Sequence, residues 1–572
     1  MKILYGTATE NYKVVWGQTT PESVGEMPKE IKLVAGKNDT AAFNAVITAD
    51  ERFALNVSSQ PWFSQHAKRK NIRLEADFPF EASLSHVGTV LCDDAYRRGD
   101  VLLNDSVVEA DDEEVLAVYC EIKVPATADK GVYNGKIKIY ENYGFSKEEL
   151  VGEINAELTV YNFVFPENKD NGFHLDLWQH PSNIARQYNV ALWSDEHFEV
   201  LEKYTKSLGE LGVKCVTVMA SEMAWNGQGC QAEKRFKANL FEYSMISTVR
   251  KADGSLVCDY SVMQRYIDLC AKYGLDECIS VYGLVNVWDA KVYGGRTAPD
   301  YPDGIHIRVY DEASGCYDYL RTAKELDEYI KQLENYFNET NQNDIVRIAA
   351  DEPADIVAYR ASLEHIKAVA PSFKYKTAIN HAEFVNEFGN DIYDFAPYIS
   401  AMFSEYDALM NFRKEMPGKR FLYYVCCCPE IPNSFIRSEL TDGYYIGILA
   451  ALAKMDGFLR WSYTCWTDEP NTDLRYGPFP VGDLGYVYPA KNGDPLLSLR
   501  WKTMYRGIKY FVLIKEAEKR NLGEALEKAY NFVLVEKDIK KLYGVWERDK
   551  IMSISADDYR NFAATLMEAL EA

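Results

Sequence analysis

The sequence lacks the features that mark several large classes of protein. None of the 12 cysteines forms a CxxC pair, and none of the eight histidines lies in an HExxH pattern, so we predict no catalytic metal and no cofactor. No apolar run is long enough to cross a bilayer, and we expect no membrane partner. The opening MKILYGTATENYKVVW has no apolar core of a signal peptide, which predicts a cytoplasmic protein.

Positive charge is scarce as well. The 63 Lys and Arg residues are outnumbered by 86 Asp and Glu residues, which gives a net charge of −23. Such an acidic chain is a poor partner for a polyanion, so we do not expect nucleic-acid binding, although a neutral sugar stays compatible with it. A hydrophobic content of 47% is typical of a globular protein, and the length of 572 residues predicts roughly two to four domains.

Aromatic residues, in contrast, are abundant. The chain has 40 Tyr and 10 Trp residues, whose faces can stack on sugar rings, although most of them must belong to the core. Among the cysteines, Cys426–Cys428 are adjacent, and Cys215 and Cys465 lie in strand-like runs. We interpret these cysteines as small buried hydrophobic residues in a reducing compartment.

Residues 1–165 have the pattern of an all-β domain. Apolar residues alternate with polar neighbours at 118–124 and again at 136–140, where the sequence reads KIKIY. Short alternating strands at this spacing predict a β-sandwich that carries no catalytic grouping of its own. The stretch FPENKDNG at 165–172 is the best linker candidate.

Strands then alternate with helices over residues 171–515. The predicted strands are 173–178, 214–220, 278–282, 345–350, 374–379, 398–403, 421–427 and 458–466. The predicted helices include 196–208, 262–273, 323–336 and 354–369. This order predicts a (β/α)8 barrel followed by a helical extension at 516–572. A doubly wound sheet is the alternative, but no GxGxxG or P-loop follows any strand. The long gap at 283–318 indicates either a functional insertion at the carboxyl face or a surface excursion.

The most informative stretch is IVRIAADEP at 345–353. A short apolar run reads as a strand buried on both faces, and it leads directly into the acidic pair Asp351 and Glu352 before Pro353. Carboxylates at the end of a barrel strand lie where pockets are usually built, and a side-by-side pair suggests glycoside chemistry with a neighbouring-group nucleophile. The competing interpretation is a helix start, since Asp, Glu and Pro all favour a first turn.

Polar and aromatic residues also occur at other predicted strand ends. The first strand ends LWQHP, the second is followed by SEMAW, and the last carries RWSYTCW. Because Trp461 and Trp466 are five residues apart, they cannot face the same side of a regular strand, so one of them should be core. Together these strand ends favour a pocket, even though a single histidine at a strand end usually packs.

Several segments resemble glycoside hydrolase family 123. The resemblance rests on LWQHP, AADEP, PNSFIR, GFLRWSYTCW and VGDLGYVYP…SLRWKTMYRGIKYF. It spans the barrel, and the alternating N-terminal region is similar to the β-sandwich of that family. Its characterised members are β-N-acetylgalactosaminidases, and the broader set includes domains of unknown function.

The resemblance implies a retaining mechanism in which the 2-acetamido group of the substrate is the nucleophile and forms an oxazolinium ion. Glu352 would be the acid and base, with its pKa raised by the charge of Asp351, and Asp351 would orient the acetamido group. The substrate would be an oligosaccharide or glycoconjugate with a terminal β-linked N-acetylgalactosamine. The candidate sugar contacts are His180, Trp225, Asn380, Trp461, Tyr463 and Trp466.

Two other functions stay open at this point. One is a retaining glycosidase with a protein nucleophile from a later strand end, for which Asp468, Glu469 and Asp483 are the candidates. The other is a carbohydrate-binding protein without catalytic activity. Dependence of hydrolysis on the 2-acetamido group separates the first alternative from the preferred mechanism, and binding without turnover would support the second.

Overall fold

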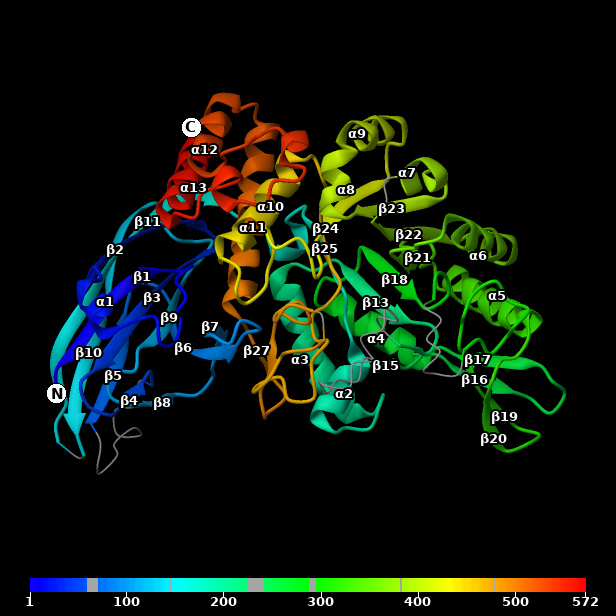
Figure 1. Ribbon diagram of the computed structural model, residues 1–572, viewed down its shortest axis with the longest axis horizontal. Helices are drawn as coiled ribbons and strands as arrows, with labels where there is room; N and C mark the ends of the chain where they lie inside the picture. The colour runs from blue at the N-terminus through cyan, green and yellow to red at the C-terminus, as the bar shows by residue number, and fades with distance from the viewer. Residues whose placement is uncertain are drawn as a thin grey trace.

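The computed structural model has an N-terminal strand-rich part, a parallel barrel and a cluster of C-terminal helices (Figure 1). It describes residues 1–58, 70–144, 146–224, 241–287, 295–380, 383–477 and 479–571. The C-terminal helices lie beside both the N-terminal sheets and the barrel. Among the residues described, no helix combines the length and the apolar character that crossing a membrane requires.

The N-terminal part consists of two sheets. The first has five strands in the order β1-β3-β9-β6-β7, and the second has six in the order β2-β11-β10-β5-β4-β8. Their bounds are β1 Ile3–Thr9, β2 Glu30–Lys37, β3 Asp39–Ala49, β4 Phe53–Asn56, β5 Lys70–Asp77, β6 Ala82–Leu91, β7 Arg97–Leu102, β8 Val107–Ala110, β9 Leu116–Val124, β10 Gly131–Tyr143 and β11 Glu149–Val164. A short helix, α1 Pro21–Glu26, precedes β2.

The alternating sequence pattern explains how these strands pack. Phe43 of β3 and Val118 of β9 are fully buried, and they share one apolar core with Ile72, Ile137 and Leu158 of the second sheet. Alternate residues of a strand point to opposite faces, so each sheet gives one apolar face to this core. The prediction of a strand-rich N-terminal region is therefore confirmed.

Eight parallel strands form a nearly closed barrel. Their order is β12-β25-β24-β23-β22-β21-β18-β13, and a parallel bridge between Leu175 and Val213 links the two ends of the sheet. The bounds are β12 His174–Leu177, β13 Cys215–Met219, β18 Cys278–Tyr282, β21 Val346–Asp351, β22 Lys374–Ile379, β23 Ile392–Pro397, β24 Arg420–Tyr424 and β25 Gly457–Arg460. The sheet curves back on itself, so the doubly wound alternative does not apply.

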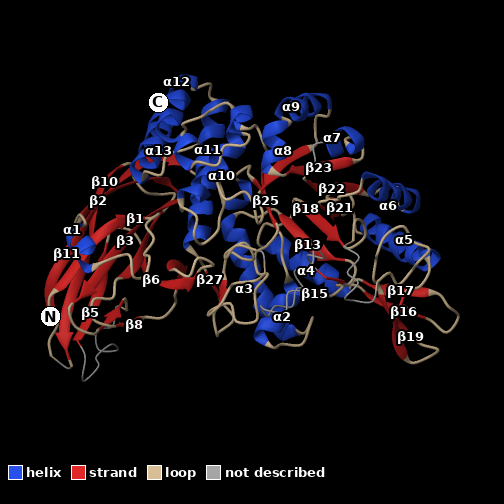
Figure 2. Ribbon diagram, in the orientation of Figure 1, coloured by secondary structure: helices blue, strands red, loops and turns tan. Residues whose placement is uncertain are grey.

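Helices follow every barrel strand and cover the outside of the barrel (Figure 2). They are α2 Pro181–Tyr188, α3 Asp195–Leu211, α4 Ser261–Lys272, α5 Ala323–Glu339, α6 Ile356–Val369, α7 Glu383–Phe388, α8 Ile399–Ser404, α9 Tyr406–Glu415, α10 Thr441–Leu452 and α11 Leu499–Lys519. The four barrel helices named from the sequence correspond to α3, α4, α5 and α6.

Two strand predictions need correction. The sixth strand was predicted at 398–403, but it is β23 at Ile392–Pro397, and the predicted segment belongs to helix α8. A short apolar run is compatible with a buried strand or a buried helix, and only the neighbouring strands decide between them. The last strand ends at Arg460, so the aromatic stretch from Trp461 to Trp466 lies beyond it.

Long loops after β13 and β18 build a small extra sheet. Its order is β17-β16-β19-β20, and it projects from the barrel at the lower right of Figure 1. The bounds are β16 Ser247–Arg250, β17 Leu256–Asp259, β19 Arg308–Asp311 and β20 Cys316–Tyr319. Two further pairs are β14 Met223–Ala224 with β15 Phe241–Glu242, and β26 Tyr488–Pro489 with β27 Pro495–Leu496. Loops that connect a barrel strand to its following helix lie at the carboxyl face, so the extra sheet belongs to that face.

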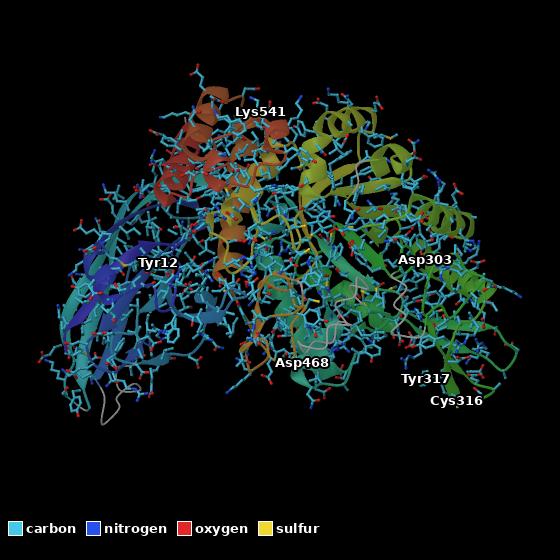
Figure 3. The ribbon with its side chains drawn as sticks, in the orientation of Figure 1. Tyr12, Asp303, Cys316, Tyr317, Asp468 and Lys541 are labelled. Atoms are coloured by element: carbon cyan, nitrogen blue, oxygen red, sulfur yellow. The ribbon has the colours of Figure 1, made fainter. Side chains whose placement is uncertain are left out.

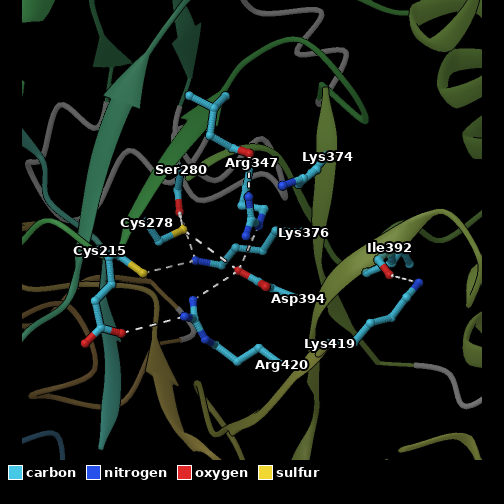
Figure 4. Close-up of polar contacts among 12 residues, drawn as sticks. Cys215, Cys278, Ser280, Arg347, Lys374, Lys376, Ile392, Asp394, Lys419 and Arg420 are labelled. Atoms are coloured by element: carbon cyan, nitrogen blue, oxygen red, sulfur yellow. Dashed lines mark hydrogen bonds and ion pairs between the residues drawn. The ribbon is translucent and has the colours of Figure 1, made fainter. Parts of the chain in front are cut away.

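A layer of buried charges fills the amino-terminal half of the barrel (Figure 4). Lys376 forms an ion pair with Asp176, and Asp394 pairs with Arg347 at 3.3 Å and with Arg420 at 3.4 Å. Asp176, Lys376 and Asp394 are at most 2% exposed. The barrel interior is therefore closed at this end, which leaves the carboxyl ends of the strands for a pocket.

Helices α11, α12 Gly523–Val533 and α13 Ala556–Glu571 form the C-terminal cluster. From α11, Arg500 donates to Asp100 of β7 at 2.9–3.1 Å, and both side chains are buried. Arg506, also from α11, pairs with Asp39 of β3 at 3.0 Å. Helix α11 therefore connects the N-terminal sheets to the barrel.

Candidate active site

A cavity of about 500 Å³ lies at the carboxyl ends of the barrel strands. Its lining includes both members of the acidic pair, Asp351 and Glu352. The other side chains that matter here are Trp178, Tyr424, Cys426, Cys427, Trp461 and Phe479. Carboxyls at strand ends surrounded by aromatic faces are the composition expected of a sugar-binding pocket.

A second cavity, of about 650 Å³, lies between the N-terminal sheets and the C-terminal helices. Its charged side chains pair with each other, since Arg506 lies 3.3 Å from Glu10 and 3.0 Å from Asp39. We assign this cavity a structural role, because its carboxylates are already neutralised by a buried guanidinium.

The backbone explains how two successive residues reach one pocket. Neighbouring residues of a regular strand point to opposite faces. Asp351 is the last residue of β21, and Glu352 then adopts a φ of +39°, in the left-handed region. The N–H of Glu352 still donates to the carbonyl of Ala378 at 3.0 Å. The left-handed residue thus breaks the alternation, and this costs about 1–3 kcal/mol of the kind often found at functional sites.

The loop after β18 holds the acidic pair from one side. Asn286 donates from its side-chain amide to the carbonyl oxygen of Asp351. Its own backbone N–H donates to Asp303 at 2.6 Å, and the N–H of Val287 donates to the same carboxylate at 2.9 Å. Asp303 is buried and accepts both hydrogen bonds, so it fixes Asn286 against the end of β21.

The protonation of the pair is strongly perturbed. Burial, and next the neighbouring charge of Glu352, raise the pKa of Asp351 to about 8. Tyr424 donates its hydroxyl hydrogen to Oε1 of Glu352, and burial raises the pKa of Tyr424 well above its ordinary value. The raised pKa of Asp351 stands beside the prediction from the sequence, which concerned Glu352. A pKa of about 8 favours the protonated form of the Asp351 carboxyl at neutral pH.

Trp461, one of the predicted sugar contacts, lines the pocket. Its indole N–H donates to Asp483 at 3.3 Å, which fixes the ring. His180 packs edge-on behind Trp461, with the ring centres 6.3 Å apart, and it is 1% exposed. Asn380 follows β22 and is half-buried, and the described residues lining the pocket do not include it or His180.

Tyr463 and Trp466 lie in the core between the barrel and α3. The Tyr463 hydroxyl shares a hydrogen bond of 2.6 Å with Ser207, and the Trp466 indole donates to the carbonyl of Val487 at 2.8 Å. Both side chains are at most 2% exposed, and neither lines the pocket. This agrees with the expectation that one of Trp461 and Trp466 is core. Trp225, another predicted contact, lies outside the described residues.

The sequence reasoning missed several pocket residues. Trp178 directly follows β12, and Tyr424 ends β24, so a search for aromatic residues at every strand end would have found them.

The prediction that the three adjacent cysteines are buried was wrong. Cys427 and Cys428 are exposed and Cys426 is half-buried, because the chain turns away from β24 before it reaches them. Cys215 and Cys465 are buried as predicted.

The alternative nucleophiles are not brought to the pocket. Asp468 and Glu469 are exposed on the loop beyond β25, where Asp468 is visible in Figure 3. Asp483 is fully buried and forms an ion pair with Arg460 at 2.6 Å behind Trp461. The described part of the pocket wall contains none of the three.

The comparisons with known proteins agree with this geometry. Residues 178–517, more than half of the chain, match the family model described as glycoside hydrolase 123, catalytic domain. A solved family 123 glycoside hydrolase from Clostridium perfringens, studied for glycolipid glycan hydrolysis, aligns with a TM-score of 0.76 at 18% identity. The alignment covers 100% of this chain and 97% of that chain, so the two share a fold.

Other comparisons are weaker. A noncanonic maltogenic α-amylase from Thermotoga neapolitana aligns with a TM-score of 0.32 at 12% identity, covering 60% of this chain and 77% of that chain. That score is too low to support an argument. No curated protein matches the chain. The family match, together with the acidic pair in its pocket, shows that this chain belongs to glycoside hydrolase family 123 and is a glycoside hydrolase.

Proposed function

We propose that the protein is a retaining exo-glycosidase that releases a terminal β-linked N-acetylgalactosamine, or a related 2-acetamido sugar, by substrate-assisted catalysis. The observation that carries the proposal is the placement of Asp351 and Glu352, adjacent in sequence, on the wall of one pocket. The candidate protein nucleophiles lie elsewhere, so the described wall offers one carboxyl pair and leaves the nucleophile to the substrate.

In this mechanism Asp351 releases its proton to Glu352 as the acetamido N–H binds, and Glu352 delivers that proton to the leaving glycosidic oxygen. The carbonyl oxygen of the acetamido group attacks the anomeric carbon as the glycosidic bond breaks, and an oxazolinium ion forms. Asp351, now ionised, accepts the acetamido N–H and stabilises the positive charge. Water then attacks the anomeric carbon while Glu352 takes its proton, so the product retains the β configuration and the acidic pair again holds one proton.

The residues around the acidic pair suit these roles of Glu352 as acid and then base and of Asp351 as the acetamido partner. The hydroxyl of Tyr424 stabilises the ionised form of Glu352 after proton transfer, since it donates to Oε1. Asn286 holds the backbone of Asp351, which leaves the carboxyl of Asp351 to the substrate. Trp461 and Trp178 line the same pocket, so aromatic side chains of the kind that stack on sugar rings lie beside the acidic pair.

We also propose three units along the chain. Residues 1–165 would form a β-sandwich, residues 171–515 the catalytic barrel and residues 516–572 the helical extension. The shared apolar core of the two N-terminal sheets supports the first unit. The substrate would be the glycan of an oligosaccharide or glycoconjugate, in keeping with the family.

The test compares two aryl glycosides, the β-N-acetylgalactosaminide and the plain β-galactoside. We expect hydrolysis of the first only, because the second lacks the internal nucleophile. Glu352→Gln should lower the rate on poor leaving groups by about 10²–10⁴-fold, since general acid catalysis is removed. Glu469→Gln is the matched control, an exposed carboxyl beyond β25, and should keep the full rate.

Each other outcome points to a different function. Hydrolysis of both glycosides, with loss of activity in Glu469→Gln or Asp468→Asn, would establish a protein nucleophile. Saturable binding of the N-acetylgalactosaminide without hydrolysis would establish a carbohydrate-binding protein instead. Full activity of Glu352→Gln would remove that residue from the acid role.

A further inference from the structure

Three consecutive cysteines lie at the edge of the active-site pocket. Cys426 and Cys427 line the cavity that also holds Asp351 and Glu352, and Cys428 follows them at the surface. The three sulfur atoms all lie within 4.8 Å of one another, and the Sγ atoms of Cys426 and Cys427 are 4.0 Å apart. A search of the described residues for three or more His, Cys, Asp or Glu side chains close enough to hold one metal ion finds this cluster.

The local chain path explains why the sulfurs gather. In a strand, successive side chains would point to opposite faces. Strand β24 ends at Tyr424, and the N–H of Cys426 donates to the carbonyl of Cys428 at 3.0 Å, which closes a tight turn. The buried side chain of Asn433 donates to the carbonyl of Cys426, also at 3.0 Å, and holds this turn in place.

This spacing suits a thiophilic cation. Zn–S bonds of about 2.3 Å around a tetrahedral ion separate neighbouring sulfurs by about 3.8 Å, close to the 4.0 Å between Cys426 and Cys427. The exposure of Cys427 and Cys428 gives an ion direct access, which a buried packing cysteine would not.

We propose that Cys426, Cys427 and Cys428 bind one soft or borderline divalent cation, with Zn²⁺ as the representative, and that the bound ion closes the active-site pocket. The thiol protons of the cluster pass to solvent as the metal–sulfur bonds form, and solvent completes the coordination. An ion with its solvent ligands would occupy the wall that the pocket shares with Asp351 and Glu352, and it would exclude the sugar. The site is inhibitory, and hydrolysis itself does not use it.

The binding half of this proposal stands by itself, whereas the inhibition half rests on the proposed glycosidase function. The first experiment therefore measures binding to the reduced, metal-free, full-length protein. Titration with Cd²⁺ should produce the ultraviolet thiolate-to-metal absorption and saturate at one ion per chain. Equilibrium dialysis with Zn²⁺ should give the same stoichiometry.

Cys428→Ser is the informative variant, because Cys428 does not line the pocket. It should weaken Zn²⁺ binding by at least about 100-fold, more than the 10–100-fold typical of an outer-shell partner. Cys316→Ser is the matched control, since Cys316 is an exposed cysteine on the projecting β19–β20 hairpin (Figure 3). It should bind Zn²⁺ as the unmodified chain does. Circular dichroism checks that both variants fold.

The second experiment follows hydrolysis of the aryl N-acetylgalactosaminide. Zn²⁺ should inhibit the unmodified chain and the Cys316→Ser variant, and a chelator should restore the rate. Cys428→Ser should have the same basal rate and resist inhibition. Equal binding by Cys428→Ser and the unmodified chain would overturn the site, and binding without inhibition would overturn the closing of the pocket. If the glycoside is not cleaved, the titrations still decide the binding half.

Discussion

The resting pocket and the proposed mechanism favour different protonation states of the Asp351 carboxyl. In the resting pocket, burial and the charge of Glu352 favour its neutral form, whereas the proposed mechanism needs its anion beside the acetamido group. A substrate that donates its N–H to Asp351 relieves this conflict, because the hydrogen bond favours the charged form. Without a bound 2-acetamido sugar, the ionised form of Asp351 therefore destabilises the folded protein.

We expect Asp351→Asn to lower turnover of the N-acetylgalactosaminide by about 10²–10³-fold, the range seen when one preorganised polar group is lost. The same change should raise stability at neutral and alkaline pH. The pKa of Asp351 is raised from 3.8 to about 8 in the folded state, so the folded chain holds a proton that the unfolded chain releases. Stability of the unmodified protein thus falls as pH rises through this window.

Thermal unfolding midpoints of the variant and the unmodified chain, measured from about pH 4 to pH 8, provide the check. The midpoint of Asp351→Asn should exceed that of the unmodified chain by an amount that grows with pH. Asp468→Asn, a change at an exposed carboxyl, should give a constant difference near zero. A gap that shrinks with rising pH would contradict the raised pKa.

At the scale of elements, strand β22 shows how the barrel is closed below the pocket. It contributes Lys376 to the buried charge layer, where the ammonium donates to the Ser280 hydroxyl at 2.9 Å (Figure 4). The same ammonium forms an ion pair with Asp176. Asp176 also accepts a hydrogen bond of 3.4 Å from Trp178, a residue of the pocket wall. A hydrogen bond therefore connects the charge layer to the wall of the active site.

Lys376→Met should lower the free energy of unfolding by about 3–5 kcal/mol, because it leaves the carboxylate of Asp176 buried without its cation. Lys374→Met on the same strand is the matched control. Lys374 pairs with Asp344, whose side chain is 98% exposed, so that change should cost no more than about 1 kcal/mol. Chemical denaturation of both variants measures the difference, and equal costs would show that burial of the pair is unimportant.

At the scale of the whole molecule, helix α11 joins parts of the chain that are distant in sequence. Besides its ion pairs to the N-terminal sheets, the segment before it pairs with β7 through the N–H of Leu102 and the carbonyl of Leu497, at 2.8 Å. Asp100 receives hydrogen bonds from Arg500 and, at 2.5 Å, from the hydroxyl of Tyr488. The N-terminal sheets are thus tied to the barrel through buried polar contacts, and we expect both parts to unfold together.

Arg500→Met should lower the thermal unfolding midpoint and separate the single calorimetric transition into two. The stability loss should be about 3–5 kcal/mol, since Asp100 is fully buried and would lose its cation. Arg475→Met, at a half-exposed ion pair with Asp473, should leave one transition with almost the same midpoint. A single unchanged transition in Arg500→Met would show that the two parts are held together by other contacts.

The sequence alone determined the succession of elements and the location of the acidic pair. Periodicity of two identified the N-terminal strands, and alternating apolar runs with amphipathic stretches identified seven of the eight barrel strands. AADEP stands out because a buried strand leading into two carboxyls is an unusual local pattern. These features are local, so neighbouring residues suffice to reveal them.

Only the tertiary structure decided which distant residues meet. Tyr463, Trp466 and Trp461 belong to one short aromatic segment, yet the first two pack near α3 and the third lines the pocket. Tyr424 reaches Glu352 from another strand, and the turn after β24 brings three sulfurs together where strand alternation would have separated them. Side-chain direction at a strand end depends on where the strand stops and how the chain turns, and packing against the rest of the molecule sets both.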